Sequence, residues 1–214
     1  MCKMKSLNKK QQRSEKTKGT IIDAAKKLFF AHGFSDVSTE QIAKESGISK
    51  GGIFHHFSSK EELGLSVLRS TLDDFKHLLP IIEESEDLRA VMRMVISETM
   101  SFGRENPGFI KMLIWFLLRI DEEADNKKFY FMMKEAFLES LLPYHQILES
   151  LFVRLEQTHP REKALLLMGL LDGIIIYTTY VDKLSKFEPE LADYFDDFDN
   201  LADLVMELFF PKKE

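Results

Sequence analysis

Hydroxyl, ammonium and imidazole side chains gather between Ser38 and Lys60, in the stretch STEQIAKESGISKGGIFHHFSSK. Hydroxyls, lysines and backbone N–H groups beside glycine are groups with which proteins bind nucleic-acid phosphates. The stretch also has the pattern of two short helices joined by Gly47, since glycine readily adopts the positive φ of a tight turn. A helix-turn-helix of this kind places its second helix in the major groove of DNA. The sequence therefore predicts a DNA-binding head.

The apolar residues of this stretch are expected to pack both helices against a preceding helix over residues 18–32. Ser38 and Gln41 have the spacing of a capping box, which predicts a helix start after Ser38. The residues expected to point inward are Ile42, Ala43, Ile48, Ile53 and Phe57. The predicted DNA-binding residues are Thr39, Ser49, Lys50, Gly51, Gly52, Phe54, His55, His56 and Lys60. For the histidines and lysines, ordinary solvated side chains are the alternative.

The net charge of −6 conceals a division of charge along the chain. Residues 1–60 carry twelve Lys or Arg and five Asp or Glu, whereas residues 61–214 carry seventeen and thirty. The first segment therefore has a net charge of +7 and the second a net charge of −13. A positive segment suits a phosphate partner, because phosphate contacts need only a local positive face. A charged tail on an acidic domain is the alternative.

Helical periodicity continues to the C-terminus, and no stretch alternates with the period of a strand. The pattern predicts an all-α protein of about nine helices. The helix that starts near Lys60 is expected to end at Pro80, and Pro143 to kink or break a later helix. The apolar helix over residues 109–121 is expected to be buried on most sides. The predicted parts are a flexible basic arm (1–16), a DNA-binding domain (17–63) and a larger helical body (64–214).

The sequence has no pattern that indicates catalysis, metal binding or export. Its one cysteine, Cys2, excludes a disulfide within the chain and suits a reducing cytoplasm. The basic N-terminus lacks the apolar stretch of a signal peptide. The most apolar run, residues 164–181, contains Asp172 near its middle, which favours a buried helix over a membrane span. We predict a cytoplasmic protein with no membrane partner, no cofactor, no metal site and no catalytic residue.

The segment Thr17–Leu63 resembles the DNA-binding domain of the TetR family of bacterial transcriptional regulators. The matching residues keep the family's spacing without an insertion; they are Thr17, Ile21, Ala24, Ala25, Leu28, Phe29, Gly33, Phe34, Ser38, Ile42, Ala43, residues 46–51, His56, Phe57 and residues 60–63. Two positions depart from the family. Phe54 stands where a Tyr hydroxyl usually reaches a phosphate, and Gly52 where a side chain often faces the bases. We therefore expect more reliance on backbone contacts and DNA shape than on direct base readout.

The resemblance also implies what the helical body does. In the family the last two helices form a homodimer, which would present two reading heads to a palindromic operator. Family members bind small, mostly apolar effectors in the body, and methionine-rich surfaces adapt to varied ligand shapes. The candidate ligand-binding residues are Phe102, Met112, Trp115, Phe116, Met133, Phe137 and Tyr177. A plain hydrophobic core is the alternative interpretation of these residues.

The function that the resemblance implies is a DNA-binding transcriptional regulator. We expect a repressor that leaves its palindromic operator when a small effector binds the body. The alternative is a helical ligand-binding or interaction module with weak or lost DNA binding. Phe54 and Gly52 are the residues that favour this alternative.

Overall fold

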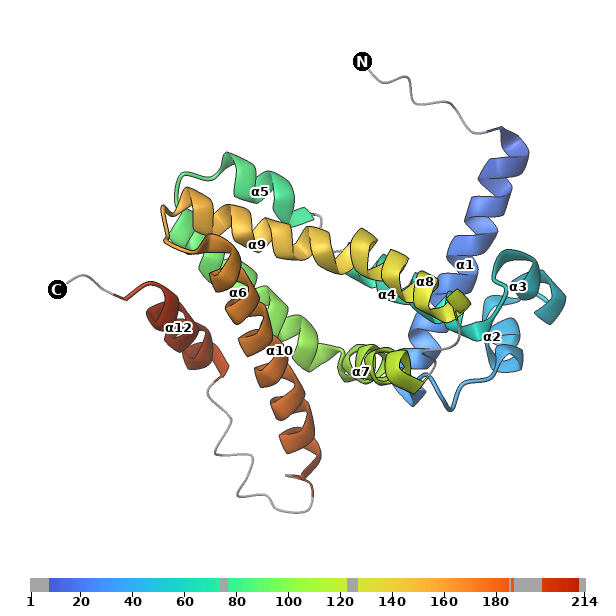
Figure 1. Cartoon of the computed structure of the whole chain (residues 1–214). Coiled ribbons are helices and arrows are strands. Elements are labelled where there is room, and N and C mark those ends of the chain that lie inside the picture. The colour runs from blue at the N-terminus through green and yellow to red at the C-terminus, as the bar shows by residue number, and fades with distance from the viewer. Residues whose placement is uncertain (1–7, 74–76, 123–126, 185, 187–197, 212–214) are drawn as a thin grey trace. The chain divides into compact units, whose positions relative to one another are not determined.

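The computed structural model describes residues 8–73, 77–122, 127–184, 186 and 198–211 (Figure 1). In this part of the chain every regular element is helical, with eleven α-helices and one π-helical segment. The all-α prediction is confirmed, and the expected number of helices was close. The chain divides into two compact units, unit 1 with residues 1–71 and 111–136, and unit 2 with residues 72–110 and 137–214. The sequence-based boundary between residues 63 and 64 marks the end of the helix-turn-helix motif and does not correspond to these units. It stays a prediction.

Unit 1 begins with α1 (Lys9–His32), which starts earlier than the sequence pattern predicted. Asn8 and Gln11 form a capping box, in which the backbone N–H of each donates to the side-chain oxygen of the other at 2.9 Å. Because this box pairs N–H groups that a helix start leaves unsatisfied, the helix can begin at Lys9. Residues 9–16 are therefore helical, and the expectation of a flexible arm up to residue 16 is wrong there.

Helices α2 (Thr39–Ser46) and α3 (Lys50–His56) follow α1 and share its core (Figure 1). The buried apolar residues of these three helices and of the turns after α1 and α3 are Ile21, Ala24, Ala25, Phe29, Phe34, Val37, Ile42, Ile53 and Phe57. Three of the five residues predicted to point inward are among them, namely Ile42, Ile53 and Phe57, whereas Ala43 and Ile48 are half-buried. The predicted packing of α2 on α1 is confirmed, and α3 packs on α2; the packing of α3 on α1 stays a prediction.

Helices α4 (Lys60–Asp73), α7 (Pro107–Glu122) and α8 (Lys127–Ala136) supply the rest of unit 1, to which only parts of α4 and α7 belong. A Cβ on Gly64 of α4 would come within 2.6 Å of the Phe34 ring and 2.8 Å of the Phe116 ring. Glycine at this position thus lets α4 approach both rings. Leu117 and Leu118 of α7 are 49% and 66% exposed, so the expectation that this helix is buried on most sides is wrong.

Unit 2 contains α5 (Leu78–Glu84), α6 (Leu88–Glu105), α9 (Leu142–Arg154), α10 (Pro160–Leu184) and α12 (Phe198–Phe209). One apolar core draws on all five helices. Arg93 of α6 donates two hydrogen bonds to the Asp203 carboxylate of α12, at 2.6 and 2.8 Å. A Cβ on Gly103 would overlap the Ile175 side chain, so a glycine allows close packing of α6 on α10.

Both prolines that the sequence marked as helix breaks lie in the first turn of a helix. Pro80 lies inside α5, so the expectation that it ends the preceding helix is wrong. A proline fits there because the first N–H groups of a helix have no partner within it. Pro143 lies in the first turn of α9, directly after the π-helical segment Phe137–Leu141. The helical segments Lys127–Ala136, Phe137–Leu141 and Leu142–Arg154 follow one another without a gap, so the expected break at Pro143 is absent and a kink there stays a prediction.

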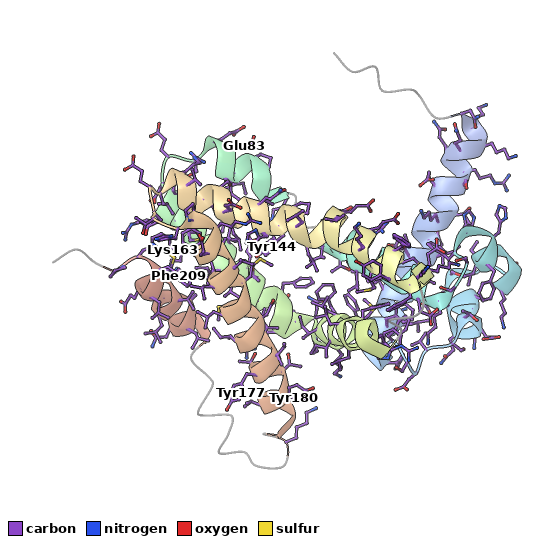
Figure 2. All side chains as sticks on the ribbon, in the orientation of Figure 1. Glu83, Tyr144, Lys163, Tyr177, Tyr180 and Phe209 are labelled. Atoms are coloured by element: carbon purple, nitrogen blue, oxygen red, sulfur yellow. The ribbon has the colours of Figure 1, made fainter. Side chains whose placement is uncertain are left out.

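Helix α10 has one buried and one exposed face. Ala164, Leu167, Leu171 and Ile175 are buried, whereas Leu165, Leu166, Tyr177 and Tyr180 are each more than half exposed. Figure 2 places the two tyrosines near the C-terminal end of the helix. Residues 160–181 are long and apolar enough to cross a membrane by length and composition, a property that core helices of soluble proteins share. The expected buried helix is therefore buried on one side only.

Candidate nucleic-acid interface

The turn between α2 and α3 is formed by local hydrogen bonds and one glycine. The Ser38 hydroxyl accepts from the Gln41 N–H at 3.2 Å, and the Gln41 side chain accepts from the Ser38 N–H at 2.7 Å. This is the capping box that the sequence predicted. Gly47 ends α2 with a φ of 69°, the left-handed conformation that glycine adopts without strain. The two helices are thereby fixed in a helix-turn-helix.

The outer surface of α3 carries the side chains that could reach DNA. Lys50, Gly51, Phe54 and His55 are exposed, and Phe54 has 44% of its surface exposed. His56 is half-buried, and its ring lies 5.3 Å from the His55 ring in an edge-on arrangement. The structure therefore brings these five predicted residues together on one short helix. Their contacts with DNA remain predictions.

The Lys50 ammonium of α3 forms an ion pair with the Glu40 carboxylate in the first turn of α2. The hydrogen bond from Lys50 is the main cause that lowers the pKa of Glu40 below its usual value. Glu40 was not among the predicted site residues. Its place in the first turn of a helix next to α3 is the only sequence signal for it, since acids are favoured at helix starts. A phosphate that approached Lys50 would compete with Glu40 for the ammonium.

Gly51 and Gly52 face different surroundings. A Cβ on Gly51 would meet open space, so Gly51 belongs to the exposed surface of α3. A Cβ on Gly52 would come within 2.8 Å of the Ile48 side chain and 3.3 Å of the Ser49 hydroxyl. Gly52 therefore packs against the turn before α3. A role of Gly52 in DNA binding stays a prediction.

Two predicted contact residues also have structural partners. The Ser49 hydroxyl accepts from the Gly52 N–H at 3.1 Å and so caps α3. Thr39 is half-buried at the start of α2, and its hydroxyl lies 3.2 Å from the Glu40 carboxylate. The Ser49 hydroxyl keeps one lone pair and its proton for another partner. The Thr39 hydroxyl can accept from an outside donor, or turn its proton from Glu40 to a phosphate.

Lys60, at the first position of α4, does not point outward as the sequence suggested. Its ammonium donates to the carbonyl oxygens of Phe34, Ser35 and Val37 at 2.8, 3.3 and 2.9 Å. The same nitrogen lies 4.6 Å from the centre of the Phe34 ring. Loss of hydration on burial lowers the pKa of Lys60. The structure thus places Lys60 on the loop between α1 and α2.

The first turns of α1 form a basic, solvent-exposed surface beside this head. Residues 9–16 are all exposed, and Lys9, Lys10, Arg13 and Lys16 outnumber the single acid, Glu15. A positive helix next to a helix-turn-helix suits a phosphate backbone electrostatically. The sequence predicted the charge of this region, whereas its helical form emerges only in the structure.

The candidate ligand-binding residues are divided between the two units. In unit 1, Met112 and Phe116 are buried, Trp115 and Met133 are half-buried, and the Trp115 and Phe116 rings are 5.0 Å apart. In unit 2, Phe102 is half-buried and Tyr177 is 60% exposed. The side chain of Phe137 lies outside the described part of the structure. Their role in ligand binding stays a prediction.

A pair of short helices with a capped, left-handed turn and an exposed second helix, in an all-helical chain, defines a helix-turn-helix protein. Residues 21–67 match the family model of bacterial regulatory proteins of the tetR family. The chain is 42% identical over 57 residues to the HTH-type transcriptional regulator SrpR of Pseudomonas putida, over 27% of each protein. It is 29% identical over 126 residues to an HTH-type transcriptional regulator of Staphylococcus aureus strain USA300, over 58% of this chain and 63% of that one. Residues 21–67 therefore form a DNA-binding domain of the tetR family type.

Solved structures share the fold over nearly the whole chain. The fatty acid degradation regulator FadR of Bacillus halodurans superposes with a TM-score of 0.65 at 18% identity, covering 91% of this chain and 95% of that one. FadR of Bacillus subtilis, solved with stearoyl-CoA, gives a TM-score of 0.64 at 20% identity, covering 92% and 99%. At these identities the likeness shows the fold. The two sequence relatives are matched over less than two thirds of their own length.

Proposed function

We propose that this protein is a DNA-binding transcriptional regulator of the cytoplasm and not an enzyme. The observation that carries the proposal is the helix-turn-helix with its capped turn at Gly47 and the exposed lysine, glycine and imidazoles of α3. The match to a family whose matched relatives are transcriptional regulators supports it. Double-stranded DNA is the partner that such a head fits, because α3 has the size and polarity for a major groove.

A homodimer through α10 and α12 is the second part of the proposal. The exposed face of α10 carries four large apolar side chains, and Gly169 and Gly173, one helical turn apart, face open space. On α12, Leu204 is 49% exposed and Leu208 is 72% exposed. Small residues between large ones let two helices approach closely, and a two-fold axis would bury the same face on both copies. Two heads related by this axis would bind a palindromic operator.

The third part is release from the operator by a small, mostly apolar effector, which makes the protein a repressor. Its support is the phenylalanine and methionine content of the body and the continuity of α4, which begins beside the head and ends in unit 2. An effector that favours one position of α4 would change the affinity for DNA, and DNA would change the affinity for the effector by the same factor. A coupling free energy of about 1–3 kcal/mol between the two sites, the usual size in allosteric proteins, would suffice for release.

The test of DNA binding is a gel shift with the DNA upstream of the gene for this chain, at two salt concentrations. We expect a specific complex whose affinity falls steeply with salt, because phosphate contacts release counterions. Competition with mixed-sequence DNA separates specific from general binding. If even mixed-sequence DNA at low salt is not bound, the alternative of a helical ligand-binding or interaction module replaces the proposal. Phe54 and Gly52 are the residues that favour that alternative.

Dimerisation and release are tested separately from DNA binding. Light scattering should give twice the chain mass, and Tyr177→Glu should give the monomer, because a carboxylate would enter an apolar face. For release, stearoyl-CoA is a suitable probe, since the FadR of similar fold was solved with it. A series of free fatty acids and aromatic acids extends the probe set. If none of these changes operator affinity, the apolar effector is refuted for these classes.

A further inference from the structure

Lys60 has its hydrogen-bonding capacity filled inside unit 1. An ammonium carries three N–H donors and no acceptor, and three carbonyl oxygens of residues 34–37 lie within 3.3 Å of the nitrogen. The nitrogen also lies over the face of the Phe34 ring, a favourable position for a cation. For a phosphate to accept from Lys60, one of these carbonyls would have to lose its donor.

The loop that Lys60 holds is anchored on its other side by aromatic rings. Phe34 is 3% exposed, and its ring centre lies 5.0 Å from Phe29, 4.4 Å from Trp115 and 5.1 Å from Phe116. Val37 is 1% exposed. The side chains at both ends of the loop are therefore packed, while its carbonyls converge on one cation that belongs to α4.

This loop leads directly into the start of α2. Ser38 caps α2, and Thr39, the candidate phosphate contact, is its first residue. The direction of the first N–H groups of α2 depends on where residues 34–37 place Ser38. A change of about 1 Å at such a junction is enough to weaken contacts that need aligned donors.

We infer that Lys60 is a positioning residue that fixes the start of α2 for DNA binding, and is not itself a phosphate ligand. The inference rests on the proposed DNA-binding function. Lys60 joins α4 to the loop before α2 in the chain without DNA. A motion of α4 would therefore move the start of α2 through this lysine.

The salt dependence of binding to a short mixed-sequence duplex distinguishes the two roles. Lys60→Met should lower affinity about tenfold, because uncharged donors at the start of α2 would lose hydrogen bonds to phosphate. The slope of log affinity against log salt should not change, because these donors release no counterions. Lys50→Met is the reference for a lysine that reaches phosphate, and should reduce that slope by about 0.9. A slope reduction of the same size for Lys60→Met would overturn the inference.

Two further variants make the test independent of the stability of Lys60→Met. Arginine binds phosphate as well as lysine does, but its planar fork cannot direct three donors to one set of converging carbonyls. Lys60→Arg should therefore lose affinity as Lys60→Met does, and wild-type affinity in Lys60→Arg would contradict positioning. In a Thr39→Val background, Lys60→Met should cost less than about twofold, because both changes remove the same contact. Additive losses would also contradict it.

Hydrogen exchange of the free protein tests the positioning without DNA. In Lys60→Arg, amides at the start of α2, including Gln41, should exchange faster, while the amides of Ile53 in α3 and of Phe57 directly after it keep their protection. Unchanged exchange at Gln41 would overturn the inference. If the wild-type chain binds no DNA, the proposed function fails, and the exchange experiment still decides whether Lys60 holds the start of α2.

Discussion

At the scale of single residues, Gly51 and Gly52 are chemically identical neighbours with different constraints. A Cβ at Gly51 would meet nothing, whereas one at Gly52 would press on Ile48. Gly51→Ala should raise the free energy of unfolding by about 0.5–1 kcal/mol, because alanine favours a helix over glycine. Gly52→Ala should lower it by about 1–3 kcal/mol through overpacking. Urea denaturation of both variants checks this, and equal effects would refute the different placements.

Phe54 offers a second residue-scale prediction, because it is exposed on α3 and lacks the hydroxyl that the family usually has there. Phe54→Tyr should raise the affinity for operator DNA about tenfold, because its hydroxyl would donate a hydrogen bond to a charged phosphate. The slope of affinity against salt should stay the same, because no charge is added. Fluorescence anisotropy at several salt concentrations measures both. An unchanged affinity would mean that this position does not reach a phosphate.

At the scale of elements, the contact between α9 and α6 of unit 2 contains a titratable group, the Tyr144 hydroxyl. The Tyr144 hydroxyl of α9 lies 2.5 Å from the Thr99 hydroxyl of α6, and Tyr144 lies in the first turn of α9. Burial raises the pKa of Tyr144 from 10.0 to about 12. The folded state therefore keeps a proton that the unfolded chain releases at lower pH, so this contribution to stability is lost as pH rises through that window.

Tyr144→Phe isolates this effect. Below pH 10.0, the variant should be less stable than the wild type by about 1 kcal/mol, because a hydrogen bond is lost and the Thr99 hydroxyl keeps its bond to the Val95 carbonyl. As pH rises toward about 12, the difference should shrink or reverse. Denaturation of both proteins across this range measures it. A constant difference would show that Tyr144 titrates alike in both states.

At the scale of the whole molecule, the proposed dimer gives the two glycines of α10 a role that they lack in one chain. Gly173 has open space around it, so Gly173→Ala should not disturb the single chain. If two copies of α10 pack across this residue, the added methyl should weaken the dimer about tenfold, as overpacking of about 1–3 kcal/mol implies. Gly19→Ala on α1, where a Cβ also meets nothing, is the matched control. Sedimentation at several concentrations compares them, and equal dimer affinities would place the interface elsewhere.

A feature could be predicted from the sequence when the residues that produce it are neighbours along the chain. The capping box at Ser38 and the left-handed Gly47 were both predictable, because interactions within a few residues produce them. The helical form of residues 9–16 was missed, since the Asn8 capping box has no apolar periodicity after it. The ion pair of Glu40 with Lys50 was missed because it joins two helices.

The sequence by itself determined the helical class, the position of the helix-turn-helix and its family, since these depend on periodicity, caps and a glycine turn at fixed spacing. Only the tertiary structure decided where Lys60 points, and that α10 has an exposed apolar face. The physical reason is that a side chain's partner depends on which distant surfaces meet. Local sequence places Lys60 at a helix start, whereas the carbonyls that it binds lie 23 to 26 residues away.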